Sequence, residues 1–372
     1  PYPGSLVLAP DLLGMMQQNS VMPVPSGLNS ALKKAACFVS SKFQYGSFNG
    51  TPLEIGYYMR AQGMGWFDVK TYWELYAPGW LAACDTAKMN VTVPTFSENF
   101  GGWAQASGWA IRTFGSHISY GWQENIWAPG SSWWIHQANS ESTVEALASN
   151  LVAEFIRKLG IYQAPYQPDF IVFDRWERDD TIGIASGYYY NARDWENFIN
   201  FSAQVGKKLG NIPVMLWQIP GGHLQVTNDI DTRSGMSSSF SNYIFGDDKL
   251  GDNLANLRSD LVNLSLNSAI YNCGTACTSK AYLNANGYKW NQDNGKLSEL
   301  AAKGIFAILW GGGSTTSVGT FPSDDGGWLA GKIRNYYQNP QPLISTSPQP
   351  TPSATPSPKP TVSPSPSPVP SP

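Results

Sequence analysis

The chain has 372 residues, a formal net charge of −3 and only 14% charged residues. Proteins that bind nucleic acid need a basic face to neutralise phosphates, so this balance argues against a nucleic-acid partner. The sequence contains no run of 18 apolar residues, so it offers no membrane span and predicts no membrane partner. Aromatic residues are abundant, with 15 Trp and 18 Tyr, and flat rings with a polar edge suit the C–H faces of sugars.

Short apolar runs alternate with amphipathic stretches through the first 338 residues, which predicts a mostly parallel α/β sheet. The expected strands are Ser5–Ala9, Leu53–Met59, Val91–Phe96, Phe170–Phe173, Val214–Ile219, Tyr243–Phe245, Ala269–Tyr271 and Ile305–Trp310. The expected helices are Asn29–Ser41, Val69–Lys88, Ser142–Leu159, Ala192–Leu209, Leu250–Leu266, Gly295–Lys303 and Gly327–Tyr337. Eight strands favour a TIM-like (β/α)8 barrel, with a doubly wound open sheet as the alternative.

The segment Asn99–Asn139 interrupts this alternation and is rich in tryptophan. We expect a long aromatic loop insertion, because loops of this length are functional or disordered and this one has too many Trp residues to be disordered. In a barrel it would extend the loop after the third strand and form a substrate-binding wall that includes Trp122 and Trp127. A packed cap or a small β-subdomain is the alternative.

After Gln338 the sequence becomes a Pro/Ser/Thr tract. Such a composition cannot bury enough apolar surface to offset chain entropy. We therefore expect residues 339–372 to form a disordered linker that follows a catalytic barrel domain of residues 1–338. The tract resembles the linkers of secreted polysaccharide-degrading enzymes, which implies a carbohydrate-binding module tethered beyond it.

The segment PDFIVFDRWERDD at 168–180 is the most informative in the chain. Four apolar residues suit a strand buried on both faces, and acids follow at once. Active sites of α/β folds lie at the carboxyl ends of such strands. Asp174 and Glu177 are therefore candidate catalytic acids, with Trp176 between them as a sugar platform. An exposed loop in which both acids pair with arginines is the alternative.

In a barrel, the residues that follow each strand converge on one mouth. Here they are Asp11, Arg60, Glu98, Asp174, Glu177, Gln218, His223, Asp247, Asp248, Asn272 and Trp310. This set is rich in carboxylates, and glycoside hydrolysis needs one protonated acid and one ionised carboxylate. We predict Glu177 as the general acid and Asp174 as the second carboxylate, with Glu98 as the alternative to Asp174.

The remaining polar and aromatic residues of this mouth are expected to bind substrate. The predicted substrate-binding residues are Trp176, Trp217, Gln218, His223, Trp310, Trp122, Trp127 and Asp247. The three histidines lack metal-ligand spacing, and the sequence NDID at 228–231 lacks a full calcium-loop pattern, so no metal is expected. Neither a GxGxxG fingerprint nor a P-loop is present, and no cofactor is expected.

Three strand-end segments, VFDRWERDD, LWQIPGG and AILWGGG, are similar to those of secreted barrel glycosidases. In the clan of retaining cellulases, mannanases and xylanases, the acid Glu follows strand four and a Trp follows strand eight. Glu177 and Trp310 match those two positions. That clan places its nucleophile Glu after strand seven, whereas residues 269–280 contain no acid. The resemblance therefore covers the architecture and the linker.

The four cysteines predict disulfides, with Cys273 and Cys277 as a local pair and Cys37 and Cys84 remaining. Disulfides and the linker together indicate an extracellular protein. The sequence thus predicts a secreted glycoside hydrolase that cleaves a β-linked polysaccharide from within the chain. The alternative function is a non-catalytic carbohydrate-binding or cell-wall protein on a barrel scaffold.

Overall fold

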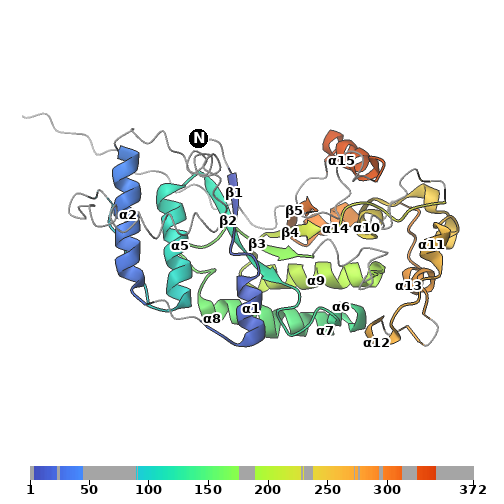
Figure 1. Ribbon diagram of the computed structural model, residues 1–372, viewed down its shortest axis with the longest axis horizontal. Helices are drawn as coiled ribbons and strands as arrows, with labels where there is room; N and C mark the ends of the chain where they lie inside the picture. Colours follow the sequence, from blue (N-terminus) through green and yellow to red (C-terminus); the bar gives the residue numbers. More distant parts are fainter. Residues whose placement is uncertain are drawn as a thin grey trace, which may run out of the picture.

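The computed structural model describes residues 4–22, 26–44, 89, 91–175, 189–227, 229, 238–271, 273–274, 277–292, 296–311 and 325–340. Their centre is one five-stranded parallel sheet with the order β1-β2-β3-β4-β5 (Figure 1). The strands are β1 (Gly4–Leu8), β2 (Ile118–Asn125), β3 (Phe170–Asp174), β4 (Val214–Ile219) and β5 (Ile305–Trp310). The protein is therefore a mixed α/β structure built on sequential parallel strands.

The sheet is curled. The rings of Phe170 in β3 and Phe306 in β5 lie 5.6 Å apart, although β4 runs between these two strands. A flat sheet would hold side chains of next-nearest strands about twice the strand spacing apart, at roughly 9–10 Å. The five strands thus form an arc, of the kind that makes up part of a barrel.

Helices surround this arc. The N-terminal half contributes α1 (Leu12–Asn19), α2 (Leu28–Gln44), α5 (Phe100–Phe114), α6 (Trp134–Gln137), α7 (Glu141–Ala146), the π-helix η2 (Leu147–Ala153) and α8 (Glu154–Leu159). The C-terminal half contributes α9 (Ala192–Lys208), α10 (Phe240–Phe245), α11 (Ser259–Val262), α12 (Ser268–Tyr271), α13 (Ser279–Leu283), α14 (Lys296–Ala302) and α15 (Trp328–Gln338), with the 3-10 turns η3 (Asp248–Leu250), η4 (Asp252–Leu254) and η5 (Ala285–Gly287).

The helix α9 shows how the local sequence fixes an element. Asn191 and Asp194 form a reciprocal capping box at its start, and two lysines in its last turn complement the helix dipole. Its buried face runs along the sheet below β3 and β4 (Figure 1), where Phe201 meets Phe173 at 5.5 Å. Trp195 and Phe198 on the same face are completely buried, so α9 is held mainly by tertiary packing.

Several predicted elements are confirmed. Four expected strands are β1, β3, β4 and β5, and the expected helices at 29–41, 192–209, 295–303 and 327–337 are α2, α9, α14 and α15. The stretch at 142–159 is helical through α7, η2 and α8. The predicted strand Leu53–Met59 and helix Val69–Lys88 lie outside the described residues. No helix in the described ranges combines the length and the apolar character that a membrane crossing requires.

Three strand predictions are wrong. Residues 91–96 form no strand, and Tyr243–Phe245 and Ala269–Tyr271 end the helices α10 and α12. Apolar runs of three residues do not distinguish a strand from a helix. The buried Phe240, Tyr243 and Ile244 recur at i, i+3 and i+4, which is the helical period.

Two larger predictions also fail. The expected aromatic loop Asn99–Asn139 contains α5, the inner strand β2 and α6, so most of its tryptophans belong to regular elements. The expected helix Leu250–Leu266 is instead a series of tight turns and the single turn of α11, with Asn253 in a left-handed conformation. The Asp and Asn residues in this segment favour turns over helix interiors.

The local disulfide between Cys273 and Cys277 is present, with a Cα–Cα distance of 5.5 Å. Cys37 is also disulfide-bonded, whereas Cys84 lies outside the described residues, as does the Pro/Ser/Thr tract from 341 onward.

Candidate functional site

The carboxyl ends of the strands carry a cluster of polar side chains. The sheet register pairs Asn125 of β2 with Asp174 of β3, and Asp174 with Trp217 of β4. Asp11, three residues after the end of β1, is the N-cap of α1. All strands are parallel, so these ends meet at one edge of the sheet, which is where α/β folds place ligands.

Asp174 is held by two amide side chains from β2. Gln123 Nε2 donates to Asp174 Oδ1 at 2.9 Å, and Asn125 Nδ2 donates to the same oxygen at 3.0 Å. Asn125 Nδ2 also donates to Asp11 Oδ1 at 2.8 Å, while the amide of Gln123 accepts a hydrogen bond from the Asp11 backbone N–H. The Asn125 amide therefore bridges the carboxylates of Asp11, at the start of α1, and Asp174, at the end of β3.

Glycine at position 14 makes this bridge possible. A Cβ atom there would collide with the Asn125 side chain, so only glycine lets α1 approach the end of β2 this closely. The short helix α1 thus packs against the end of β2, next to the hydrogen bonds that join Asp11, Asn125 and Asp174.

Glu124 is the most unusual group at this edge. Its side chain is completely buried, and burial raises its pKa to about 8; the nearby Asp174 adds to the rise, while a hydrogen bond from the Asn125 N–H opposes it. Glu124 Oε1 accepts that N–H at 2.9 Å, and Oε2 has no hydrogen-bond partner. Burial therefore favours the protonated form of this carboxyl.

Arg175 and aromatic rings flank the acids. The guanidinium of Arg175 lies 4.1 Å from the centroid of the Tyr190 ring, and its backbone N–H donates to Trp217 O at 3.0 Å. Trp217 is half-buried. Gln218 follows it with a φ of 52°, at a shift in register between β4 and β5, so the predicted strand-end pair Trp217 and Gln218 lies beside Asp174.

The predicted catalytic residues are distributed differently. Asp174 lies in the cluster, whereas Glu177 and Trp176 lie outside the described residues. Glu98 is exposed and directly precedes Asn99, the N-cap of α5. It therefore does not follow a strand, because the strand expected before it does not form.

The tryptophans predicted to bind substrate lie in different environments. Trp122 is 1% exposed and packs edge-on against Phe100 and Trp103, which leaves no face of its ring for a sugar. Trp127, after β2, is half-buried, and Trp310 ends β5 and packs 5.4 Å from Phe240.

His223 and Asp247 lie together in a second buried group. His223 Nδ1 is 3.6 Å from Asp247 Oδ2, and the imidazole stacks on Trp328 with centroids 4.8 Å apart. Asp229 approaches the other ring nitrogen at 3.9 Å. Within the described ranges, no group of three or more His, Cys, Asp or Glu residues is arranged to hold a metal ion.

Sequence reasoning missed Gln123, Glu124 and Asn125 because it assigned them to a loop. In the segment just before Gln123, the apolar residues Ile118, Tyr120 and Trp122 alternate with small or polar residues. This period of two is the signal of a strand, and it could have placed Glu124 at a strand end.

Comparisons with known proteins give no family for this chain: no family model matches it, and no significant match was found among curated proteins or among solved structures.

Proposed function

We propose that this protein is a glycoside hydrolase in which Glu124 is the general acid and Asp174 is the second carboxylate. The observation that carries the proposal is a buried carboxyl with its pKa raised to about 8 near another carboxylate, at the carboxyl edge of a parallel sheet. A carboxyl whose pKa is raised by an apolar environment is typical of a general acid.

The roles follow from the surroundings of each group. Protonated Glu124 would donate its proton to the glycosidic oxygen as that bond breaks, and Asp174 would attack the sugar or activate water. The amides of Gln123 and Asn125 hold Asp174 in place. A sugar ring would stack on the half-buried Trp217, which is paired with Asp174 in the sheet register.

The proposal also includes four expectations that come from the sequence. They are secretion, a β-linked polysaccharide as substrate, a binding module beyond the linker and a (β/α)8 scaffold. The curled parallel sheet supports a barrel-type scaffold, and Leu53–Met59 is a further strand that the sequence predicts.

Two observations favour the non-catalytic alternative. The Glu124 side chain is 0% exposed, and a catalytic acid must reach the substrate. Glu124 also lies on the face of β2 opposite to Gln123 and Asn125, whose amides hold Asp174. In a carbohydrate-binding protein the same glutamic acid would be a neutral, structural part of the core, and the tryptophans would serve binding alone.

Substitution separates these functions. We expect Glu124→Gln and Asp174→Asn each to lower the release of new reducing ends from polysaccharides about 10²–10⁴-fold, the usual contribution of an acid or base. The exposed Glu98→Gln is the matched control and should retain wild-type turnover. Testing Glu177→Gln in parallel decides between Glu177 and Glu124 as the acid. Full activity of Glu124→Gln would exclude the proposed pair, and binding without products in the wild type would favour the alternative.

A further inference from the structure

A cavity of about 300 Å³ lies apart from the Glu124–Asp174 pair, between α6, the start of α9 and the segment that contains α12 and α13. Small-molecule sites are concave and carry a few polar groups that converge on the ligand. This cavity joins segments that are more than 140 residues apart in sequence, because its lining extends from His136 to Asn286.

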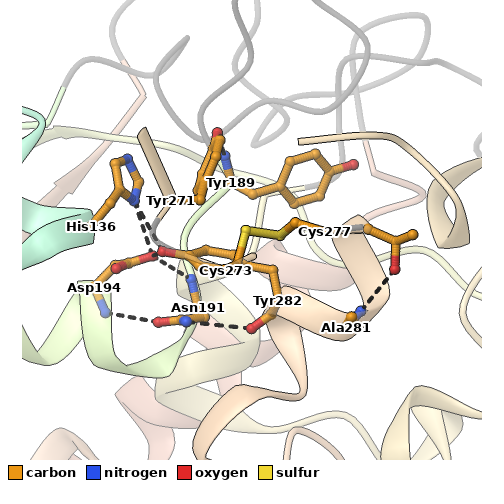
Figure 2. The surroundings of a disulfide bond; sticks show 10 residues. His136, Tyr189, Asn191, Asp194, Tyr271, Cys273, Cys277, Ala281 and Tyr282 are labelled. Atoms are coloured by element: carbon orange, nitrogen blue, oxygen red, sulfur yellow. Dashed lines mark hydrogen bonds and ion pairs between the residues drawn. A yellow bond between two sulfur atoms is a disulfide. The ribbon is translucent and has the colours of Figure 1, made fainter. Parts of the chain in front are cut away.

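The floor of the cavity is a fixed network of polar groups (Figure 2). Tyr282 donates its hydroxyl to Asp194 Oδ2 at 2.7 Å, and the Asn191 backbone N–H donates to the same oxygen at 2.8 Å. His136 Nδ1 lies 3.3 Å from this oxygen. The side chains of His136 and Asp194 are 1% and 3% exposed. These contacts hold the floor rigid without any ligand.

The disulfide cross-links one wall of the cavity. Figure 2 shows the Cys273–Cys277 bond near Tyr271 and Tyr282, and all four residues line the cavity. The ring of Tyr271 lies 4.7 Å from the His136 ring, and its hydroxyl accepts the Tyr189 backbone N–H at 2.8 Å. The wall therefore presents ordered aromatic rings at little cost in conformational entropy on binding.

The rim is polar and exposed. Asn139, Arg193 and Asn286 line it and are open to solvent. Amide side chains both donate and accept hydrogen bonds, as sugar hydroxyls do. The single rim guanidinium is balanced by the carboxylate of Asp194 in the floor, so the cavity gives no preference for an anion.

We propose that this cavity binds a neutral sugar residue of a glycan, as a second carbohydrate site. The cavity itself is independent of the catalytic pair, but the choice of a glycan rests on the proposed function. A chain of contacts links the two sites: Arg175, next to Asp174, lies over the Tyr190 ring, whose edge meets the His136 ring at 5.0 Å.

Calorimetric titration of the full chain tests this assignment. The probes are neutral hexasaccharides of β-glucan, β-mannan and β-xylan, with a uronic-acid hexamer as the charged counterpart. The parent protein carries Glu124→Gln, so that hydrolysis does not interfere. The added Asn139→Ala/Arg193→Ala pair should raise the Kd of the neutral probe that binds about tenfold, which is the worth of one to two hydrogen bonds.

The matched control is Arg334→Ala/Asn335→Ala on the exposed surface of α15, which should leave the Kd within about twofold. Unchanged affinity in the cavity variant, no binding of any neutral probe, or tighter binding of the uronic-acid hexamer would overturn the proposal. If the cavity variant loses affinity while the wild type releases no products, the cavity site stands and the proposed catalytic function fails.

Discussion

The Glu124 side chain is ionisable and fully buried, and glutamate is rarely buried to this extent in a protein core. The structure keeps the group neutral: Oε1 accepts one backbone N–H, Oε2 has no partner, and the nearby Asp174 disfavours a second negative charge. Burial and a neighbouring carboxylate act in the same direction on its pKa. This residue therefore links the stability of the fold to pH and to the proposed chemistry.

The raised pKa predicts that stability falls as pH rises. The unfolded chain ionises Glu124 above about pH 4.5, whereas the native protein keeps it protonated up to about pH 8. The contribution of Glu124 is therefore complete below about pH 4.5 and is lost progressively towards about pH 8, at about 1.4 kcal/mol per pH unit. Urea unfolding between these values should show this slope, and Glu124→Gln should flatten it. An identical slope in both proteins would contradict the burial argument.

At the scale of secondary structure, a helix or strand is predicted from a pattern that spans several residues. The glycines and tryptophans of 99–139 suggest a loop and hide the strand β2. Ile118, Tyr120 and Trp122 nevertheless recur at every second position, as apolar residues of a strand do. Gly121 is needed there for space: a Cβ at this position would strike the side chain and the carbonyl oxygen of Phe170 in β3. Glycine in a strand often marks such a close approach.

Substitution of this glycine tests the packing of β2 against β3. We expect Gly121→Ala to destabilise the protein by about 1–3 kcal/mol, the usual cost of overpacking. The matched control is Gly331→Ala in α15, where a Cβ would meet nothing within 4 Å. It should be neutral or stabilise by roughly 0.5–1 kcal/mol, because alanine favours helix. Equal effects in thermal unfolding would refute the close approach.

At the scale of the molecule, one large apolar cluster joins the sheet to α1, α5, α8, α9, α10 and α14. The last described residues, 339 and 340, follow α15 and are exposed. The composition from Gln341 to Pro372 offers almost no large apolar side chains to add to this cluster.

We therefore expect a chain that ends at Pro340 to match the stability of the full chain within about 0.5 kcal/mol, as for changes remote from packed features. Differential scanning calorimetry of the two proteins checks this. A clear drop in the melting temperature of the shorter chain would show that the Pro/Ser/Thr tract packs on the domain.

Local patterns in the sequence are enough to predict several parts of this protein. Four strands, the long helices α2 and α9, the local disulfide and the position of Asp174 at a strand end follow from apolar runs, helical periodicity and spacing. The contacts between these elements depend on the tertiary fold. Glu124 acquires its raised pKa from burial and from Asp174, and His136 meets Tyr282 across 146 residues. Such effects arise from contacts between distant segments, which no local pattern encodes.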